Sequence, residues 1–358
     1  SSAASDVYKR QIFFVNTLVA LIFLVSLIIP FIPPRIFSFL SVIGLFTPFL
    51  ITLNFIFIFF WIYKLKKQFF LSLFVLLIGH ATLKNFINFS NNSVYATDDK
   101  ISILSYNVRL FNLYKWIDNS EIENDINKFL IEKDTDIICL QEYRNNVLIM
   151  PNHPYKYEYL RGDNINYGQV IYSKFPIINS EIIDLGSRSN SAIYVDIEIN
   201  KKIIRIYNVH LESFSLTNTK DLNIFQNSRN ELYESVSKTF SIQQDQLEII
   251  EKNISKSPHD IIFSTDLNNT AFSYIYRQLN KKLKDSFIEK GNGFGTTFFY
   301  NFIPLRIDFI MISKSLRVNK FKTYEINYSD HKPIYTEIII WSKNYNNLVL
   351  SLIHISEP

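Results

Sequence analysis

The chain has 358 residues, of which 47% are hydrophobic and 16% aromatic, and its formal net charge is +4. Residues 98–341 carry 29 Lys and Arg against 31 Asp and Glu, so the basic excess lies in the N-terminal quarter. This composition excludes intrinsic disorder and a collagen-like structure and argues against a basic nucleic-acid-binding surface over the whole chain. Cys139 is the sole cysteine, which excludes an intrachain disulfide and a Cys-based zinc cluster.

The two ends of the chain differ in pattern from the segments beside them. Residues 1–11 and 351–358 resemble translated adaptor or cloning sequence, and neither continues the pattern of its neighbour. We expect a non-native leader and a non-native tail, so neither is used to predict the fold.

Residues 12–89 contain three apolar runs close together. Residues 11–34 and 36–63 are free of charge over 24 and 28 residues, and each exceeds the roughly 20 apolar residues that cross a bilayer core. The third run, 68–83, has only 16 residues, but Lys84 can extend to the interface and let the helix continue to Phe89. The sequence predicts a membrane anchor of three transmembrane helices, or of two if the third run is a buried core helix.

Lys64, Lys66 and Lys67 form the densest basic cluster beside any of these runs. By the positive-inside rule this cluster stays in the cytoplasm. With three spans, everything after a short polar linker at residues 90–99 lies on the non-cytoplasmic side of the cytoplasmic (inner) membrane, whereas with two spans it lies in the cytoplasm. We expect a multi-pass protein whose large C-terminal domain is exported.

Residues 100–342 change to short β-branched runs bounded by polar turns, which are typical of strands. We expect strands at residues 101–108, 136–140, 169–173, 192–199, 202–211, 260–264, 306–313 and 334–340. Helical patterns lie at residues 119–132, 221–254 and 271–279. Strands of both buried and alternating type with interspersed helices predict two packed sheets flanked by helices, in one domain.

Polar residues lie at the ends of five of these strands, and three more precede the last strand. The first set is Asn107, Gln141, Glu142, Asn208, His210, Asp266, Asn268 and Asp308, and the second is Ser329, Asp330 and His331. A rigid scaffold aims side chains from such positions. Oxygen ligands bind a hard divalent ion, amides bind phosphate oxygens, and His and Asp transfer protons, so the pattern indicates a metal-dependent phosphoryl site.

The segments around these residues occur in a fixed order: SYNVRLFN, DIICLQE, GQVIYSKFPI, YNVHLES, FSTDLN, RIDFI and SDHKPI. Over residues 100–341 this series resembles the endonuclease/exonuclease/phosphatase superfamily, the metal-dependent phosphodiesterases and phosphatases with the deoxyribonuclease-type fold. The resemblance implies a four-layer α/β sandwich, with two packed mixed β-sheets flanked by helices, preceded in this chain by transmembrane α-helices. It also implies Mg²⁺ as the cofactor, with Mn²⁺ as the alternative.

The same resemblance implies three residues at the metal. Glu142 matches the family's principal Mg²⁺ ligand, and Asn107 lies beside it at the metal and the phosphate. Asp330 belongs to the terminal Asp-His pair and supports metal binding.

It further implies the catalytic residues. Asp266 and Asn268 match the Asp-x-Asn pair that orients the attacking water and holds the phosphate. Asp308 matches the acidic partner of His331, whose imidazole acts as a base or stabilises the pentacoordinate phosphorane. The alternative for Asp308 is a surface ion pair with Arg306.

Two positions leave alternatives open, and two more depart from the family pattern. His210 resembles the second histidine of the deoxyribonuclease, sphingomyelinase and sugar or inositol phosphate phosphatase branches, and the alternative is a packed core histidine. Arg109 either contacts phosphate or forms a solvent salt bridge. Ser264 and Thr265 stand where the family usually has Gly, which puts the fine placement of Asp266 in question.

These features predict a membrane-anchored, Mg²⁺-dependent phosphoric ester hydrolase at the outer face of the cytoplasmic membrane, acting on a lipid-linked or small phosphoester. One alternative is a membrane-tethered endonuclease or exonuclease, and a second is a catalytically inactive membrane-bound binding module. The expected partners are a phosphoester substrate and the lipid bilayer, and the sequence indicates no obligate protein partner.

Overall fold

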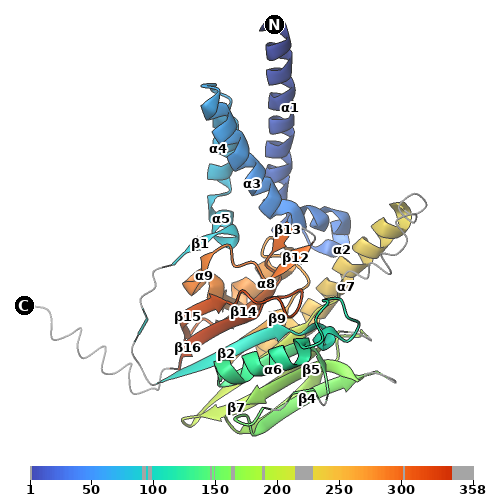
Figure 1. Ribbon diagram of the computed structural model, residues 1–358, viewed down its shortest axis with the longest axis vertical. Coiled ribbons are helices and arrows are strands. Elements are labelled where there is room, and N and C mark those ends of the chain that lie inside the picture. Colours follow the sequence, from blue (N-terminus) through green and yellow to red (C-terminus); the bar gives the residue numbers. More distant parts are fainter. Residues whose placement is uncertain are drawn as a thin grey trace, which may run out of the picture.

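The computed structural model describes residues 2–90, 94–95, 99–145, 147–148, 150–162, 166–187, 190–213, 229–300 and 303–340. The expected tail at 351–358 and the first part of the helix expected at 221–254 lie outside these residues. Within them, a bundle of N-terminal helices stands on one side of a two-sheet domain (Figure 1).

Helices occupy most of residues 2–86. They are α1 (Ser2–Ser26), η1 (Ile29–Phe31), α2 (Pro34–Phe37), η2 (Ser38–Leu40), α3 (Ser41–Tyr63), α4 (Phe69–Ile78) and α5 (His80–Phe86). The stretches Asp6–Phe31 and Pro34–Tyr63 are long and apolar enough to cross a membrane. Helix α1 begins at Ser2 and includes most of the expected leader.

The third apolar run differs from the single helix that we expected. Helices α4 and α5 meet at an angle of 83°, and the pair counts as a span only if it is taken as one broken helix. The break falls at Gly79, where an added Cβ would lie 2.7 Å from the ring of Phe23. Glycine therefore allows the chain to turn against α1 at this point.

A buried polar cluster joins three of the N-terminal helices. Asn16 Nδ2 on α1 donates to Ser72 Oγ on α4 over 2.6 Å, and Trp61 Nε1 on α3 donates to Asn16 Oδ1 over 2.9 Å. All three side chains are fully buried. Polar groups in apolar surroundings are costly unless they are paired, so this cluster fixes the helices relative to one another.

Two six-stranded sheets form the C-terminal domain. The first has the order β15 (Arg317–Thr323), β16 (Ile334–Ile339), β2 (Lys100–Asn107), β3 (Ile137–Arg144), β5 (Tyr167–Ser173) and β4 (Tyr155–Arg161). The second has the order β10 (Leu283–Asp285), β14 (Asp308–Ser313), β9 (Asp260–Asp266), β8 (Lys202–His210), β7 (Ser191–Ile199) and β6 (Ile177–Ile183). Two short antiparallel pairs add β1 (Asn88–Phe89) with β11 (Asn292–Gly293), and β12 (Phe298–Tyr300) with β13 (Ile303–Leu305).

Helices cover the outer faces of both sheets. Helix α6 (Ile122–Lys133) packs on the first sheet, and α7 (Arg229–Lys256) and α8 (Tyr274–Lys282) pack on the second, while α9 (Ser286–Lys290) lies beside β14 and β15. Between the sheets is an isoleucine-rich core in which Ile103, Ile206 and Ile310 are fully buried. Burying one such side chain stabilises the fold by about 1.5–3 kcal/mol. The predicted four-layer α/β sandwich is confirmed.

The strand register brings the polar strand ends to one place. Strands β2 and β3 run parallel, as do β8 and β9, so their carboxyl ends meet at the same edges. His210 is paired with Asp266 across β8 and β9, and Asp266 is paired with Asp308 across β9 and β14. This register places the side chains of His210, Asp266 and Asp308 on neighbouring strands at one edge of the second sheet.

Candidate active site

Asp266 is the centre of the assembled polar residues. Its side chain is fully buried, and its Oδ2 accepts a hydrogen bond from Asn107 Nδ2 over 3.0 Å. The Nε2 atoms of His210 and His331 each lie 3.7 Å from the same oxygen. Residues from both sheets therefore converge on one carboxylate.

Glu142 enters this site from a β-bulge. The pairing of β3 with β5 shifts register between Gln141 and Tyr143, and Glu142 between them has a φ of +49°. A bulge re-aims the extra side chain, and a non-glycine residue in this left-handed region costs about 1 kcal/mol or more. Glu142 Oε1 accepts from Asn107 Nδ2 over 3.1 Å and lies 3.9 Å from His210 Nε2.

Asn107 joins the two carboxylates. Its Nδ2 donates to both Glu142 and Asp266, while its Oδ1 accepts from the backbone N–H of Arg109 over 3.0 Å. In this arrangement Asn107 holds the carboxylates of Glu142 and Asp266 close to each other.

His331 and Asp308 form a buried pair. His331 Nδ1 donates to Asp308 Oδ2 over 2.9 Å. Burial by itself lowers the pKa of His331, but the carboxylates of Asp308 and Asp266 outweigh it and raise that pKa well above its ordinary value. Burial raises the pKa of Asp308 to about 6, although the His331 imidazolium opposes this rise. The alternative partner, Arg306, instead donates to Asp285 over 2.6 Å.

His210 faces the carboxylates of Glu142 and Asp266. Its side chain is buried, and its Nε2 has no hydrogen-bond partner among the residues that the structure describes. Glu212, the only acidic neighbour evident in the sequence, accepts from Ser187 Oγ over 2.9 Å instead. A buried polar atom left without a partner indicates a place for a ligand.

Asp330 lies next to His331 in the chain but its carboxylate is engaged elsewhere. Its Oδ2 lies 3.0 Å from Arg109 Nη1, and the Arg109 guanidinium also stacks over the ring of Trp116 at 4.3 Å. Of the two alternatives for Arg109, a phosphate contact or a salt bridge, the structure contains a salt bridge, and its partner is Asp330.

Asn268 and Thr265 flank Asp266. Asn268 has a φ of +47°, its backbone N–H donates to Asp266 Oδ1 over 2.8 Å, and its Nδ2 donates to Leu211 O over 3.0 Å. Thr265 is fully buried one residue before Asp266, and Ser264 Oγ donates to Ser105 Oγ over 2.6 Å. Ser264 is thus paired between the two sheets, whereas Thr265 Oγ1 has no hydrogen-bond partner among the described residues.

Supporting residues appear that the motifs did not assign. Ser329 Oγ donates to the backbone O of Asn107 over 2.9 Å, and Thr297 Oγ1 accepts from the backbone N–H of Asp308 over 3.1 Å. Gln141 Nε2 donates to Asn208 Oδ1 over 2.7 Å, which joins the two sheets beneath the site. Gln141 and Asn208 stand at strand ends in the sequence, whereas nothing local marks Thr297.

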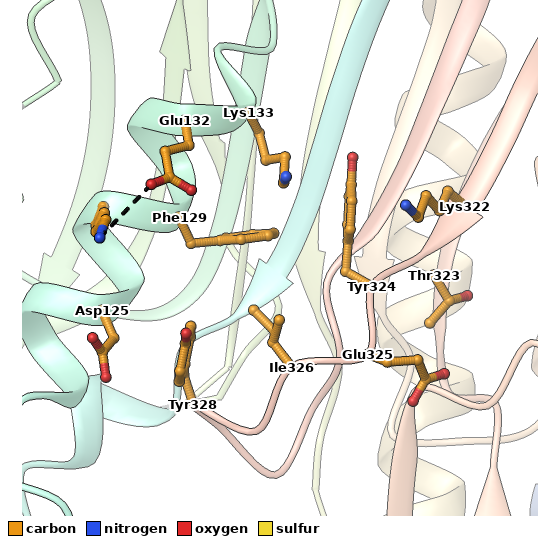
Figure 2. A pocket seen from close by; sticks show the side chains of 11 residues that line it. Asp125, Phe129, Glu132, Lys133, Lys322, Thr323, Tyr324, Glu325, Ile326 and Tyr328 are labelled. Atoms are coloured by element: carbon orange, nitrogen blue, oxygen red, sulfur yellow. Dashed lines mark ion pairs between the residues drawn. The ribbon is translucent and has the colours of Figure 1, made fainter.

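A separate hollow of about 580 Å³ lies between α6 and residues 322–328 (Figure 2). Figure 2 shows Lys133 and Lys322 on either side of the ring of Tyr324, with Glu132 and Glu325 also at the rim. Charges of both signs line it, so it carries no clear preference for an anion or a cation. None of the residues expected at the active site lines this hollow.

The residues at the site suit a hard divalent ion. Ligand atoms of Asp266, Asp308 and His331 lie within 4.8 Å of one another and all three residues are buried, but His331 is already paired with Asp308 and its raised pKa favours the imidazolium, which cannot bind a cation. The candidate ligands are therefore carboxylate oxygens. The carboxylate oxygens of Glu142 and Asp266 are both held by Asn107, and carboxylate oxygens are the donors such an ion prefers.

Solved structures provide a comparison of the fold. An endonuclease/exonuclease/phosphatase from Bacteroides vulgatus is 16% identical, with a TM-score of 0.53, and the match covers 68% of this chain and 99% of that one. The mannosyl-6-phosphatase of Bacteroides thetaiotaomicron is 16% identical, with a TM-score of 0.50, covering 67% and 100%. A humanized D. rerio TDP2 is 17% identical, with a TM-score of 0.50, covering 67% and 99%. At these identities the likeness shows the fold alone.

Sequence comparison gives three results. No curated protein matches the chain. Residues 9–86 match a domain of unknown function, and residues 104–331 match the endonuclease/exonuclease/phosphatase family. The second match spans more than half of the chain, from within β2 to His331. The chain therefore belongs to the endonuclease/exonuclease/phosphatase family, whose members are divalent-metal-dependent hydrolases of phosphoric esters, and it is an enzyme of that class.

Proposed function

We propose that this chain is a membrane-anchored phosphoesterase that uses Mg²⁺ to hydrolyse a lipid-linked or small phosphoester at the outer face of the cytoplasmic membrane. The observation that supports this best is the convergence of Asn107, His210 and His331 on the buried carboxylate of Asp266. Phosphoryl transfer depends on charge placed around the phosphate in this way.

Glu142 would hold the metal, with Asn107 orienting its carboxylate. Asp330 would support metal binding only by exchanging its ion pair with Arg109 for the metal. When bound, the ion supplies positive charge that stabilises the phosphate oxygens and the leaving oxygen. The unpartnered Nε2 of His210 supports the placement of the phosphate beside these groups, since a phosphate oxygen can accept from it.

Asp266 is placed to accept the proton of the attacking water, because its buried carboxylate lies at the meeting point of the donors. His331 keeps its proton, since Asp308 accepts from Nδ1 and favours the imidazolium. Its Nε2–H then faces the site and can donate to a phosphate oxygen as negative charge develops. His210 donates through Nε2 to a second oxygen, and Asn268 holds the turn that follows Asp266.

The proposed orientation rests on the basic cluster at residues 64–67. In Figure 1 the start of α1 and the turn between α3 and α4 lie at the end of the bundle away from the two sheets. If α4 and α5 together make the third crossing, the positive-inside rule places the sheets outside the cytoplasm.

A substrate at the bilayer surface is favoured by the position of the hairpin β12–β13. Strand β13 lies against α3, and Phe298 of β12 forms a bridge with His331, with ring centroids 5.0 Å apart. One hairpin therefore connects the helical anchor to a catalytic residue. Confinement to the membrane surface raises the effective concentration of a lipid-linked substrate.

A substrate panel tests this proposal on the full chain in lipid nanodiscs. Hydrolysis of bis-p-nitrophenyl phosphate, mannose 6-phosphate, sphingomyelin vesicles and a single-stranded oligonucleotide is measured with Mg²⁺ and with EDTA. We expect Mg²⁺-dependent hydrolysis of a lipid or small phosphoester that Glu142→Gln abolishes and that Glu132→Gln, an exposed control on α6, retains.

Two outcomes would replace the proposal. Cleavage of the oligonucleotide alone would make the chain a membrane-tethered nuclease, in the manner of D. rerio TDP2, which has been seen with a single-strand DNA product. A protein that binds these compounds and hydrolyses none of them would be the inactive binding module.

A further inference from the structure

The loop that follows the catalytic aspartate needs outside support. Residues 267–273 lead from Asp266 to α8, and Asn268 within this loop has a left-handed backbone. Asparagine tolerates that conformation better than most residues, but the position of the loop still depends on the contacts around it. The contacts of this loop therefore decide where Asp266 and Asn268 point.

The inner side of the loop is held by α7. Gln243 is fully buried, and its Nε2 lies within 3.3 Å of the backbone oxygens of both Leu267 and Asn268. Its Oε1 accepts from Asn269 Nδ2 over 2.8 Å. One side chain thus fixes three consecutive residues directly after Asp266.

The outer side of the loop is held by the N-terminal helices. Thr270 Oγ1 donates to the backbone O of Gly44 on α3 over 3.2 Å. Asn85 Nδ2 on α5 donates to the backbone O of Ala271 over 3.0 Å. A Cβ added at Gly44 would lie 3.2 Å from Phe272 O, so α3 and the loop are in close contact.

The same loop contributes an apolar side chain to the helical bundle. Phe272 is 3% exposed and belongs to a core cluster with Phe23 and Ile51, both fully buried. Burial of an aromatic ring among these helices ties the loop to the bundle more firmly than the hydrogen bonds alone. If the helices were only a membrane tether, they would be joined to the C-terminal domain by the connecting chain alone and would not pack against this loop.

We infer that the N-terminal helices are positioning elements of the active site: α3 and α5 fix residues 270–272 and thereby the direction of Asp266 and Asn268. This inference rests on the proposed function, because it concerns the rate of that reaction. Asn85 and Thr270 are the positioning residues, and neither touches the reacting atoms. The N-terminal helices therefore affect the catalytic rate of the domain as well as anchoring it to the membrane.

Two substitutions in the full chain, in nanodiscs, test this. Asn85→Leu removes one hydrogen bond between α5 and the loop. Thr270→Val removes the hydrogen bond from the loop to Gly44 on α3 and also the one that Thr270 Oγ1 accepts from the backbone N–H of Phe272. Asn54→Leu is the matched control, since Asn54 is buried on α3 but donates to Leu50 O of its own helix over 2.9 Å. Because a misplacement of about 1 Å can cost up to a hundredfold, we expect Asn85→Leu and Thr270→Val to lower kcat about tenfold with KM within a factor of two.

Asn54→Leu should leave kcat unchanged, and Thr270→Ser, which keeps the hydroxyl donor, should restore the activity lost in Thr270→Val. Wild-type kcat in both Asn85→Leu and Thr270→Val would overturn the inference, and so would an equal loss in Asn54→Leu. Failure of the proposed function itself looks different, because the unsubstituted chain would then show no Mg²⁺-dependent hydrolysis or Glu142→Gln would retain it.

Discussion

The Nδ1 of His331 lies 2.9 Å from the Oδ2 of Asp308, and both side chains are buried. The two residues come from different places in the chain: Asp308 begins β14 of the second sheet, and His331 precedes β16 of the first. The contact therefore forms only when the two sheets pack against each other. Folding of the sandwich and assembly of the acid–base pair are one event.

The pH dependence of this pair can be measured. The pKa of Asp308 is raised to about 6 and that of His331 lies well above its ordinary value, so the ionised pair exists above about pH 6. We expect kcat to rise through pH 6 and then to level off. In Asp308→Asn the largest of the carboxylate contributions that raise the pKa of His331 is gone, while that of Asp266 remains, so the imidazolium is lost at lower pH than in the unsubstituted chain and kcat should begin to fall at a lower pH. A pH profile of Asp308→Asn parallel to that of the unsubstituted chain would contradict this role.

The two histidines are expected to act on the same phosphate. Each lies 3.7 Å from Asp266 Oδ2, so both Nε2 atoms border the same space. We predict that His210→Ala and His331→Ala each lower kcat by about a hundredfold or more, and that the double variant loses much less than the product of the two. Kinetics on protein whose folding is confirmed by circular dichroism decide this. If His210→Ala retains kcat within about threefold and only lowers the melting temperature, His210 is a packing residue.

Asn208 is expected to stabilise the sandwich without touching the substrate. Its Nδ2 donates to the backbone oxygens of Leu140 and Val170 over 2.9 and 3.0 Å, from the second sheet to the first. Asn208→Ala leaves these buried acceptors and Gln141 short of a partner, which should lower the free energy of unfolding by about 3 kcal/mol. Thermal unfolding should show a drop of several degrees, against no change for Asn124→Ala on the exposed face of α6. Equal melting temperatures would mean that water replaces the lost bonds.

Membrane topology is testable on the full chain because Cys139 is buried and will not react. Lys66 and Lys128 are both exposed, the first in the turn between α3 and α4 and the second on α6. A membrane-impermeant maleimide should label Lys128→Cys in intact cells, with the outer membrane permeabilised, and should label Lys66→Cys only after lysis. The reverse pattern would place the catalytic domain in the cytoplasm.

Local sequence patterns predicted the sandwich well, because β-branched runs and polar turns report directly on buried strands. The expected helices at 119–132 and 271–279 correspond to α6 (Ile122–Lys133) and α8 (Tyr274–Lys282), with ends shifted by one to three residues. The break at Gly79 was missed, since it depends on the packing of Phe23 against a neighbouring helix and hydropathy carries no such information.

The types and the order of the site residues were predictable from the sequence, and so was one of their contacts. The motif order pointed to Asp308 and His331 together, and the structure pairs them. The bulge that turns Glu142 toward the site arises from the register between β3 and β5. The hydrogen bonds from Gln243 to the loop after Asp266 come from α7, which is distant in the sequence. Such long-range relationships leave no local signal.

The most direct measurement is the rate of bis-p-nitrophenyl phosphate hydrolysis by the full chain and by Glu142→Gln, each with Mg²⁺, Mn²⁺, Zn²⁺ or EDTA. Because the proposed ligands are oxygens, we predict activity with Mg²⁺ or Mn²⁺, none with Zn²⁺ or EDTA, and a loss of at least about a thousandfold in Glu142→Gln at an unchanged melting temperature. Full activity after exhaustive chelation, or a Glu142→Gln variant as fast as the unsubstituted chain, would contradict a metal-dependent phosphoesterase centred on Glu142.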